Sequence, residues 1–374
     1  MNKNFILLAL TQFFSILNDN LIKNAIVTIA IFINSSNISF PAIAGGLFVL
    51  PYILFSSISG EISDKYNKAV LIKILKITEF ITFFIALLSI YFQNHFLMFL
   101  SVFLLGIQTT MISPIRLSII PKIVSLKHLT TANGIIDGSG FIGVLCGTLM
   151  GTYICKYPNY FSYISVITII SFCVSLISSL FLKSPDNFYD IKINKNIYRS
   201  TMEHCKEIIK FNLEKECYIL SYFWLICSLM ITMFPNIVKY NLHLENQYFT
   251  MFLFIFTIGM GIGSFVSNIF PIKNISTIIV FSKVMLIILS LSVLFENIIA
   301  IGLSLFCVAF FSSIYSVRTY TYIQTHVEEH HIGRIFSAIN IYNAIFMILG
   351  ACGLLIASYC SLPYYLIICL LAFL

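Results

Sequence analysis

The sequence predicts an all-α membrane protein, and its composition and charge distribution carry that prediction. Of the 374 residues, 59% are hydrophobic and 10% are charged, whereas soluble domains average about 45 to 50% and about 25%. Thirteen of the 37 charged residues lie between positions 183 and 216. The rest of the chain is therefore compatible with lipid, and a water-soluble fold is excluded.

Twelve apolar runs, each bounded by polar residues or proline, predict twelve transmembrane helices. A hydrocarbon core about 30 Å thick needs about 20 helical residues per crossing, so the chain is long enough for all twelve. The first run has no small-residue cleavage site after it, so we expect a retained span rather than a signal peptide. The last run spans about 20 Å as a helix, so we expect it to be short or truncated. The runs cover 5–33, 40–62, 70–92, 96–120, 131–154, 161–182, 218–238, 249–270, 275–295, 298–322, 332–359 and 362–374.

Basic residues fall unequally on the two sides of the predicted membrane. The gaps that follow odd-numbered runs hold only Lys156 and Lys239, whereas the other side holds fourteen basic residues, counting Arg334 at the start of the run 332–359. Because Lys and Arg near short loops are retained in the cytoplasm, both termini are predicted to be cytoplasmic.

A charged segment divides the runs into two sets of six. We expect an N-terminal six-helix bundle (1–182), a cytoplasmic linker (183–217) and a C-terminal six-helix bundle (218–374). This layout is typical of carriers whose two halves rock around a site near the bilayer midplane. The linker is interpreted as a solvated tether, or as a surface helix that uses Met202 and Ile209 among its apolar residues.

The first run is unusually polar for a segment that crosses lipid. Asp19 lies 14 residues beyond Phe5, about 21 Å along a helix. A charge at that depth costs about 2.5 to 3.5 kcal/mol and normally faces a cavity or a partner. Two interpretations stay open: a local pair with Lys23 that permits insertion, or the lining of a transport pathway. The candidate substrate-binding residues are Gln12, Asn18, Asp19, Asn20, Lys23 and Asn24.

The loop after the second run carries a motif, Gly60-Glu61-Ile62-Ser63-Asp64-Lys65-Tyr66-Asn67-Lys68. It resembles the signature of the major facilitator superfamily between spans two and three, Gly-x-x-x-Asp-basic-x-Gly-basic-basic. Asn67 replaces the second Gly, and Ala69 replaces the last basic residue. The resemblance implies the major facilitator fold.

Each residue of this motif has a physical interpretation as part of a latch. Gly60 permits close helix approach, and Asp64 can meet a helix N-terminus or a basic group of the opposite half. Lys65 and Lys68 are expected to hold the loop in the cytosol. Two intramembrane charges of later spans extend the latch to an ion-pair cluster that closes the cytoplasmic side. The candidate gate residues are Gly60, Asp64, Lys65, Lys68, Arg116, Asn133 and Asp137.

A narrower resemblance is carried by Asn18-Asp19-Asn20 within residues 11–25, supported by segments 51–55, 113–121 and 132–137. These segments resemble the bacterial lysophospholipid transporter family, whose carrier domain is also found joined to an acyltransferase and an acyl-carrier-protein ligase. The resemblance covers residues 5–155 well and the second half weakly. It implies a lysophospholipid substrate, the bacterial inner membrane and a separate acyltransferase as a partner.

One departure from this family lies in the second half. The resemblance leads us to expect a basic residue in the seventh span, yet none occurs between Tyr218 and Val238. Lys283 in the ninth span is a weak substitute. A carrier of a small water-soluble metabolite or drug, with the same polar first span as its site, is the alternative function.

Other charged and glycine-rich features receive structural interpretations. Lys76 and Glu79 are three residues apart and can pair locally, and Arg318 can extend its guanidinium to the membrane surface. The glycines at 143, 147 and 151 predict a helix-packing groove. Thr148 after Gly147 argues against a drug and proton antiporter, which would have Pro there.

Enzymatic and metal chemistry find little support in the sequence. None of the seven histidines has Asp five residues later, the spacing that membrane acyltransferases use, so no catalytic residue is assigned. The ten cysteines include no Cys-x-x-Cys pair, and segment 325–331 lacks an ordered set of three ligands. We therefore expect no enzyme, no metal site, no cofactor and no nucleic-acid partner.

Overall fold

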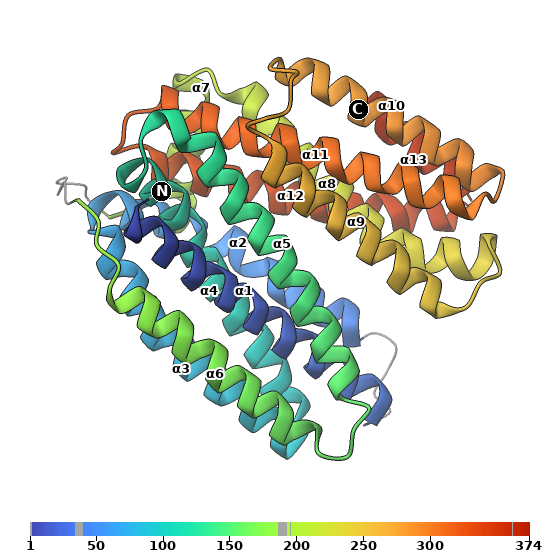
Figure 1. Ribbon diagram of the computed structural model, residues 1–374, viewed down its shortest axis with the longest axis horizontal. Coiled ribbons are helices and arrows are strands. Elements are labelled where there is room, and N and C mark those ends of the chain that lie inside the picture. The colour runs from blue at the N-terminus through green and yellow to red at the C-terminus, as the bar shows by residue number, and fades with distance from the viewer. Residues whose placement is uncertain (1, 34–39, 186–192, 195, 361) are drawn as a thin grey trace. The chain divides into compact units, whose positions relative to one another are not determined.

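The computed structural model describes residues 2–33, 40–185, 193–194, 196–360 and 362–374 (Figure 1). All regular secondary structure in these ranges is helical, with three short 3-10 or π turns beside the α-helices. The α-helices are α1 Lys3–Thr28, α2 Phe40–Lys65, α3 Lys68–Phe92, α4 His95–Ile123, α5 Leu129–Ile154, α6 Tyr160–Leu180, α7 Ile197–Lys210, α8 Glu214–Asn236, α9 Asn246–Val266, α10 Ile275–Leu294, α11 Ile298–His326, α12 Ile332–Tyr359 and α13 Tyr364–Phe373.

Each predicted apolar run coincides with one of these helices. Ten helices of the described residues are long and apolar enough to cross a membrane. The 25-residue α3 is also long enough, but it is not among these ten and carries four charged residues, Lys68, Lys73, Lys76 and Glu79. The 10-residue α13 is short, as the sequence predicts. The one helix outside the apolar runs is α7, which lies in the charged linker.

Asparagine side chains begin several helices because they accept a hydrogen bond from the free N–H groups of the first turn. Asn2 Oδ1 accepts from Phe5 N–H at the start of α1, at 3.0 Å. Asn67 Oδ1 accepts from Val70 N–H at the start of α3, at 2.9 Å. The departure of Asn67 from the signature glycine therefore has a structural reason, since it caps α3 directly after the two-residue link from α2.

The chain forms two compact units. The first unit comprises Met1–Ala132, Ile142–Leu213 and Ile323–Ile341, and the second comprises Asn133–Phe141, Glu214–Tyr322 and Tyr342–Leu374. Helices α5, α11 and α12 each contribute residues to both units. The linker helix α7 belongs to the first unit, together with α1 to α4 and α6.

In the first unit, α1 lies beside α6, and α2 and α3 lie beside α4 (Figure 1). Its apolar core combines residues of all these helices, including Leu21 and Ile26 of α1, Phe83 of α3 and Leu105 of α4. Half of the α1 segment that spans the membrane is buried. Gln12 and Asn18 of α1 are buried among neighbouring helices, whereas its other polar residues are only partly buried.

Glycines of α5 allow its backbone to touch α1. A Cβ atom on Gly143 would lie 3.1 Å from the carbonyl oxygen of Phe13, and a Cβ on Gly147 would overlap that of Leu17. Gly151 meets the carbonyl of Leu21 in the same way. The predicted helix-packing groove is confirmed for this stretch of α5.

The second unit is built around α8, whose residues Tyr222, Phe223 and Ile226 are buried in its core. Beside it, α10 packs against α13 (Figure 1). Arg318 of α11 donates to the main-chain oxygens of Ser267 and Phe270 at 2.7 and 2.9 Å. The guanidinium thus satisfies carbonyl groups just beyond the end of α9, and its extension to the membrane surface stays a prediction.

We expect Gly147→Leu to destabilise the protein, because the new side chain displaces α5 from the α1 backbone. Overpacking of a close contact costs about 1 to 3 kcal/mol. Thermal unfolding in detergent measures the effect, with maleimide labelling of buried cysteines such as Cys227 as the readout of unfolding. Gly46→Leu is the matched control, since a Cβ there meets no atom within 4 Å. Equal melting temperatures for the two variants would contradict the packing role of Gly147.

Candidate functional site

The polar side chains of α1 fall on two faces. Gln12 and Asn18 are buried, whereas Asp19, Lys23 and Asn24 are half-buried, as is Asn20. Asn18 Nδ2 donates to the Thr168 carbonyl of α6 at 3.0 Å. The buried face therefore holds α1 against α6, and the half-buried face keeps polar groups partly accessible.

The asparagines of the half-buried face are bound mainly within α1. Asn20 Nδ2 donates to the Ile16 carbonyl at 2.8 Å, and Asn24 Nδ2 donates to the Asn20 carbonyl at 2.8 Å. Asn24 Nδ2 also lies 3.1 Å from the Thr148 hydroxyl of α5. Thr148, where an antiporter would have proline, thus accepts a hydrogen bond from α1.

The two charged side chains of this face do not pair with each other. Among the residues that the structure describes, no ion pair joins Asp19 to Lys23, and Asp19 Oδ1 has no hydrogen-bond partner. The Lys23 ammonium instead lies 4.4 Å from the centroid of the Phe48 ring of α2. The local Asp19–Lys23 pair, one of the two open interpretations, is therefore not formed in this structure.

A second charged pair lies beside Asp19. Lys76 Nζ is 2.5 Å from Glu79 Oε2, and their side chains are 4% and 6% exposed. Lys76 also donates to the hydroxyl of Ser15 on α1. Glu79 and Lys76 act electrostatically on Asp19. The predicted Lys76–Glu79 pair is confirmed. Together with Lys23, its two residues place three charged side chains around Asp19.

Another polar cluster surrounds Asp64, at the end of α2 that precedes the short link to α3. Asp64 Oδ1 accepts from Gly333 N–H at 2.7 Å, and Oδ2 accepts from Arg334 N–H at 3.0 Å. These N–H groups belong to the first turn of α12, which favours a negative charge. The Arg334 guanidinium also donates to Asp64, with 3.2 Å between Nε and Oδ2. Asp64 is fully buried in this arrangement.

Two glycines bring α2 and α12 this close. A Cβ on Gly60 would lie 2.9 Å from the Gly333 carbonyl oxygen and would overlap the Ser337 side chain. A Cβ on Gly333 would lie 2.8 Å from the Gly60 carbonyl oxygen. Small residues on both helices therefore let Asp64 reach the N–H groups of α12. The sequence motif indicates Gly60 but gives no signal for Gly333.

The linker helix α7 adds a second layer of charges. Glu207 Oε1 lies 2.7 Å from Arg334 Nη1. Glu61 of α2 accepts from the Ser200 hydroxyl at 2.6 Å and lies 3.5 Å from His204 Nε2. The face of α7 that packs on α2 is therefore polar and buried.

The predicted linker is thus only partly correct. A helix is present and Met202 and Ile209 are exposed, but Ser200 and His204 are buried against α2 rather than solvated. Lys68, expected to anchor the loop in the cytosol, is only 2% exposed. Its ammonium contributes positive charge near Asp64. These burials have one cause, since buried carboxylates attract polar and basic partners from neighbouring helices. The cytosolic location of Lys68 stays a prediction.

The seven candidate gate residues are divided between the two units. Gly60, Asp64, Lys65, Lys68 and Arg116 lie in the first unit, whereas Asn133 and Asp137 lie in the second. Asn133 Nδ2 donates to the Thr321 hydroxyl at 3.0 Å within the second unit. Arg334, which is not among the candidate gate residues, forms an ion pair with Asp64.

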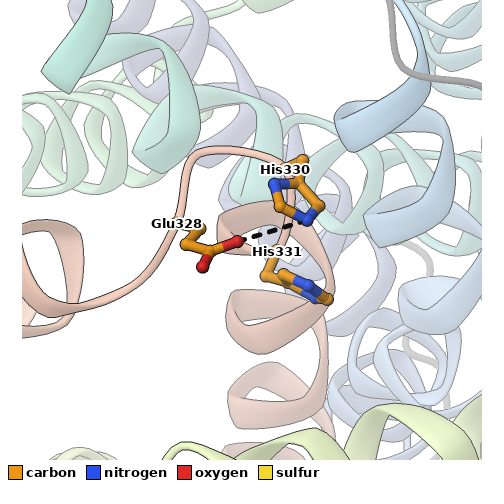
Figure 2. A group of neighbouring side chains, drawn as sticks. All are labelled: Glu328, His330 and His331. Carbon is orange, nitrogen blue, oxygen red and sulfur yellow. Dashed lines mark ion pairs between the residues drawn. The ribbon is translucent and has the colours of Figure 1, made fainter.

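Three potential metal ligands lie in the loop between α11 and α12 (Figure 2). One donor atom from each of Glu328, His330 and His331 lies within 4.8 Å of the others. His330 Nε2 is 3.4 Å from Glu328 Oε2, and His331 Nδ1 is 3.3 Å from Glu207 Oε2. Burial lowers the pKa of His331 below its usual value, partly offset by Glu207. Arg334 Nη2 lies 3.0 Å from His331 Nδ1, so these groups extend the ionic cluster around Arg334. The absence of a metal site stays a prediction.

The comparisons with known proteins identify the class of this chain. The model of the Major Facilitator Superfamily matches residues 8–351, so the chain belongs to the major facilitator superfamily. None of the curated proteins matches it in sequence. The predicted all-α membrane protein with the major facilitator fold is confirmed. Membership in this superfamily indicates an integral membrane transporter rather than an enzyme.

Several solved structures share this fold at low sequence identity. The human organic anion transporter MFSD10 (TETRAN) has a TM-score of 0.73 and 10% identity, over 99% of each chain. The E. coli fucose:proton symporter FucP has a TM-score of 0.73 and 12% identity, over 99% of this chain and 95% of its own. A bacterial homologue of the iron transporter ferroportin, in an outward-facing state, has a TM-score of 0.69 and 14% identity, over 100% and 99%. At these identities the likeness shows the fold alone.

We expect the Glu207–Arg334 pair to couple α7 to α12 energetically. A double-mutant cycle of Glu207→Gln and Arg334→Gln measures this coupling. The coupling free energy of contacting residues in one ionic network is about 0.5 to 3 kcal/mol. Thermal unfolding in detergent supplies the four stabilities. The exposed Arg199–Glu203 pair on the same helix is the matched control, and such surface pairs give about 0.2 to 1 kcal/mol. Additive effects of the two Gln substitutions would contradict the coupling.

Proposed function

We propose that this protein is a lysophospholipid carrier that moves its substrate to the cytoplasmic leaflet by alternating access. One observation carries the proposal: α1 holds a carboxylate and an ammonium one turn apart, on a half-buried face, without an ion pair between them. A lysophospholipid with an amine in its head group presents the complementary pair of charges. The resemblance of residues 5–155 to the lysophospholipid transporter family supports the same substrate.

The head group is the part of the substrate that needs the carrier. An unpaired polar group costs several kcal/mol in hydrocarbon, so phosphate and amine need substitute partners during the crossing. Asp19 binds the amine, and Lys23 binds a phosphate oxygen. The side-chain oxygens of Asn20 and Asn24 accept hydrogen bonds from the glycerol hydroxyl. Their Nδ2 groups already donate to α1 carbonyls.

The neighbouring Lys76–Glu79 pair sets the charge of this site. With both groups ionised the pair is neutral, so Asp19 and Lys23 remain the charges that a substrate can meet. Burial of the pair at 4% and 6% exposure keeps it away from the substrate and fixed by Ser15. A zwitterion therefore meets a charge of opposite sign for each of its own two charges. A simple anion or cation is attracted by one of the two residues and repelled by the other.

The Asp64 cluster is the part that we assign to gating. In this proposal the two six-helix bundles, residues 1–182 and 218–374, rock against each other, and both termini are cytoplasmic. The contacts of Asp64 with α12 close the cytoplasmic side and break once in each cycle. The linker helix α7 reinforces the closed state through Glu207. The protein resides in the bacterial inner membrane, and a separate acyltransferase re-acylates the delivered lipid.

We expect Asp19→Asn to reduce the uptake of labelled lysophosphatidylethanolamine into proteoliposomes at least tenfold. The substitution removes the charge that binds the amine and keeps the size of the side chain. Membrane insertion and the elution profile in detergent are expected to be unchanged. Glu245→Gln, which removes a carboxylate from the exposed loop before α9, is the matched control and should retain uptake.

Two results would contradict this proposal. Normal lipid uptake by Asp19→Asn would remove Asp19 from the substrate site. Uptake of a polar solute by the unmodified protein without any uptake of the lipid would favour the alternative carrier of a small water-soluble metabolite or drug.

A further inference from the structure

The second unit contains a cavity of about 220 Å³ between α8 and α10. Its polar lining consists of Lys215, Tyr218 and Tyr222 from α8 and of Ser276 and Lys283 from α10, and two isoleucines complete it. On α8 these positions follow a spacing of three and four, and on α10 a spacing of seven, so each set lies on one helix face. The two faces meet near the first residues of α8 and α10.

The charge of this cavity is uniformly positive. Lys215 and Lys283 line it, and no acidic side chain does. Glu214 and Glu216 flank Lys215 along α8 but do not line the cavity. Among the described residues neither lysine forms an ion pair. Lys215 Nζ lies 3.3 Å from the Ser276 hydroxyl, and Lys283 Nζ lies 5.5 Å from the centre of the Tyr222 ring.

The two tyrosines shape the cavity and leave its donors free. Tyr222 Oη donates to the Leu371 carbonyl of α13 at 2.7 Å, and Tyr218 Oη donates to the main-chain oxygen of Leu374. Both hydroxyl protons are therefore used within the unit. The ammonium groups and the Ser276 hydroxyl remain as the donors for a bound molecule. Two cations and a hydroxyl around one small volume fit the oxygens of a phosphate.

We propose that this cavity binds the phosphate of an anionic membrane lipid. Ser276 is the second residue of α10, and Lys283 lies seven residues further, about 10 Å along the helix. Lysines near the ends of membrane helices extend their ammonium groups toward the head groups, and basic pockets between such helices hold anionic lipids. Exposed Val280 and Val284 of α10 provide apolar surface for acyl chains. A free phosphate ester shares the head-group chemistry but would gain nothing from that surface.

This site is separate from the polar face of α1 and does not rest on the proposed transport function. All its residues lie in the second unit, whereas Asp19 and Lys23 lie in the first. A lipid held there would be a resident of one leaflet rather than the transported molecule. Binding and uptake can therefore fail independently of each other.

The test measures lipid binding to the full chain in detergent by native mass spectrometry. The probes are phosphatidylglycerol, phosphatidylcholine and glycerol 3-phosphate. We expect phosphatidylglycerol to bind at least tenfold more tightly than phosphatidylcholine. The double variant Lys215→Gln with Lys283→Gln should lose at least tenfold in phosphatidylglycerol affinity. Lys239→Gln with Lys273→Gln removes the same charge from the same unit outside the cavity and should stay within twofold of the unmodified protein.

A third variant separates charge from folding. Lys215→Arg with Lys283→Arg keeps both cations and should retain binding, which a purely structural role of lysine would not predict. Equal losses in the cavity variant and the control variant would overturn the site. Binding of glycerol 3-phosphate as tight as that of phosphatidylglycerol would overturn the assignment to a lipid.

Discussion

The bond between Asp64 and the first turn of α12 is the interaction on which the arrangement of the first unit depends. A fully buried carboxylate is stable only when several donors surround it. Here two main-chain N–H groups and a guanidinium supply them. Gly60 and Gly333 allow the approach, Lys68 adds positive charge, and Glu207 balances the guanidinium. The two glycines, the lysine and the linker glutamate therefore all contribute to the surroundings of this one buried carboxylate.

The polar groups of α1 obey the same rule incompletely. Asn18 and Asn24 find partners on α6 and α5, as expected for a helix in a nonpolar surrounding. Asp19 Oδ1 and Gln12 Nε2 lack them. Unsatisfied groups of this kind are expensive inside a protein, and such cost concentrates at functional sites. Asn18 is satisfied only through Nδ2, since its Oδ1 also lacks a partner among the described residues, and Asp19 is the one charged group of this set.

Much of the fold follows from the sequence, because lipid imposes long apolar runs whose ends are marked by polar residues. The run at 332–359 coincides with α12, and the short last run coincides with α13. Local pairs such as Lys76 with Glu79 follow from helical spacing. Distant pairings follow only in part: the motif leads us to expect Asp64 at a helix N-terminus or a basic group of the opposite half, but it does not indicate α12 or Arg334 as these partners. Nothing in the sequence near Arg334 resembles a motif, and the proximity of Glu207 depends on how α7 folds back onto α2.

The Asn67 cap has a mechanical consequence. Because only Tyr66 and Asn67 separate α2 from α3, and because Asn67 fixes the first turn of α3, the two helix ends cannot shift independently. A displacement of Asp64 therefore moves α3 as a rigid helix. Lys76 and Glu79 lie about 13 and 18 Å along that helix, beside Asp19. In the proposed transport cycle, release of Asp64 from α12 would therefore move two charged groups, Lys76 and Glu79, that act on Asp19.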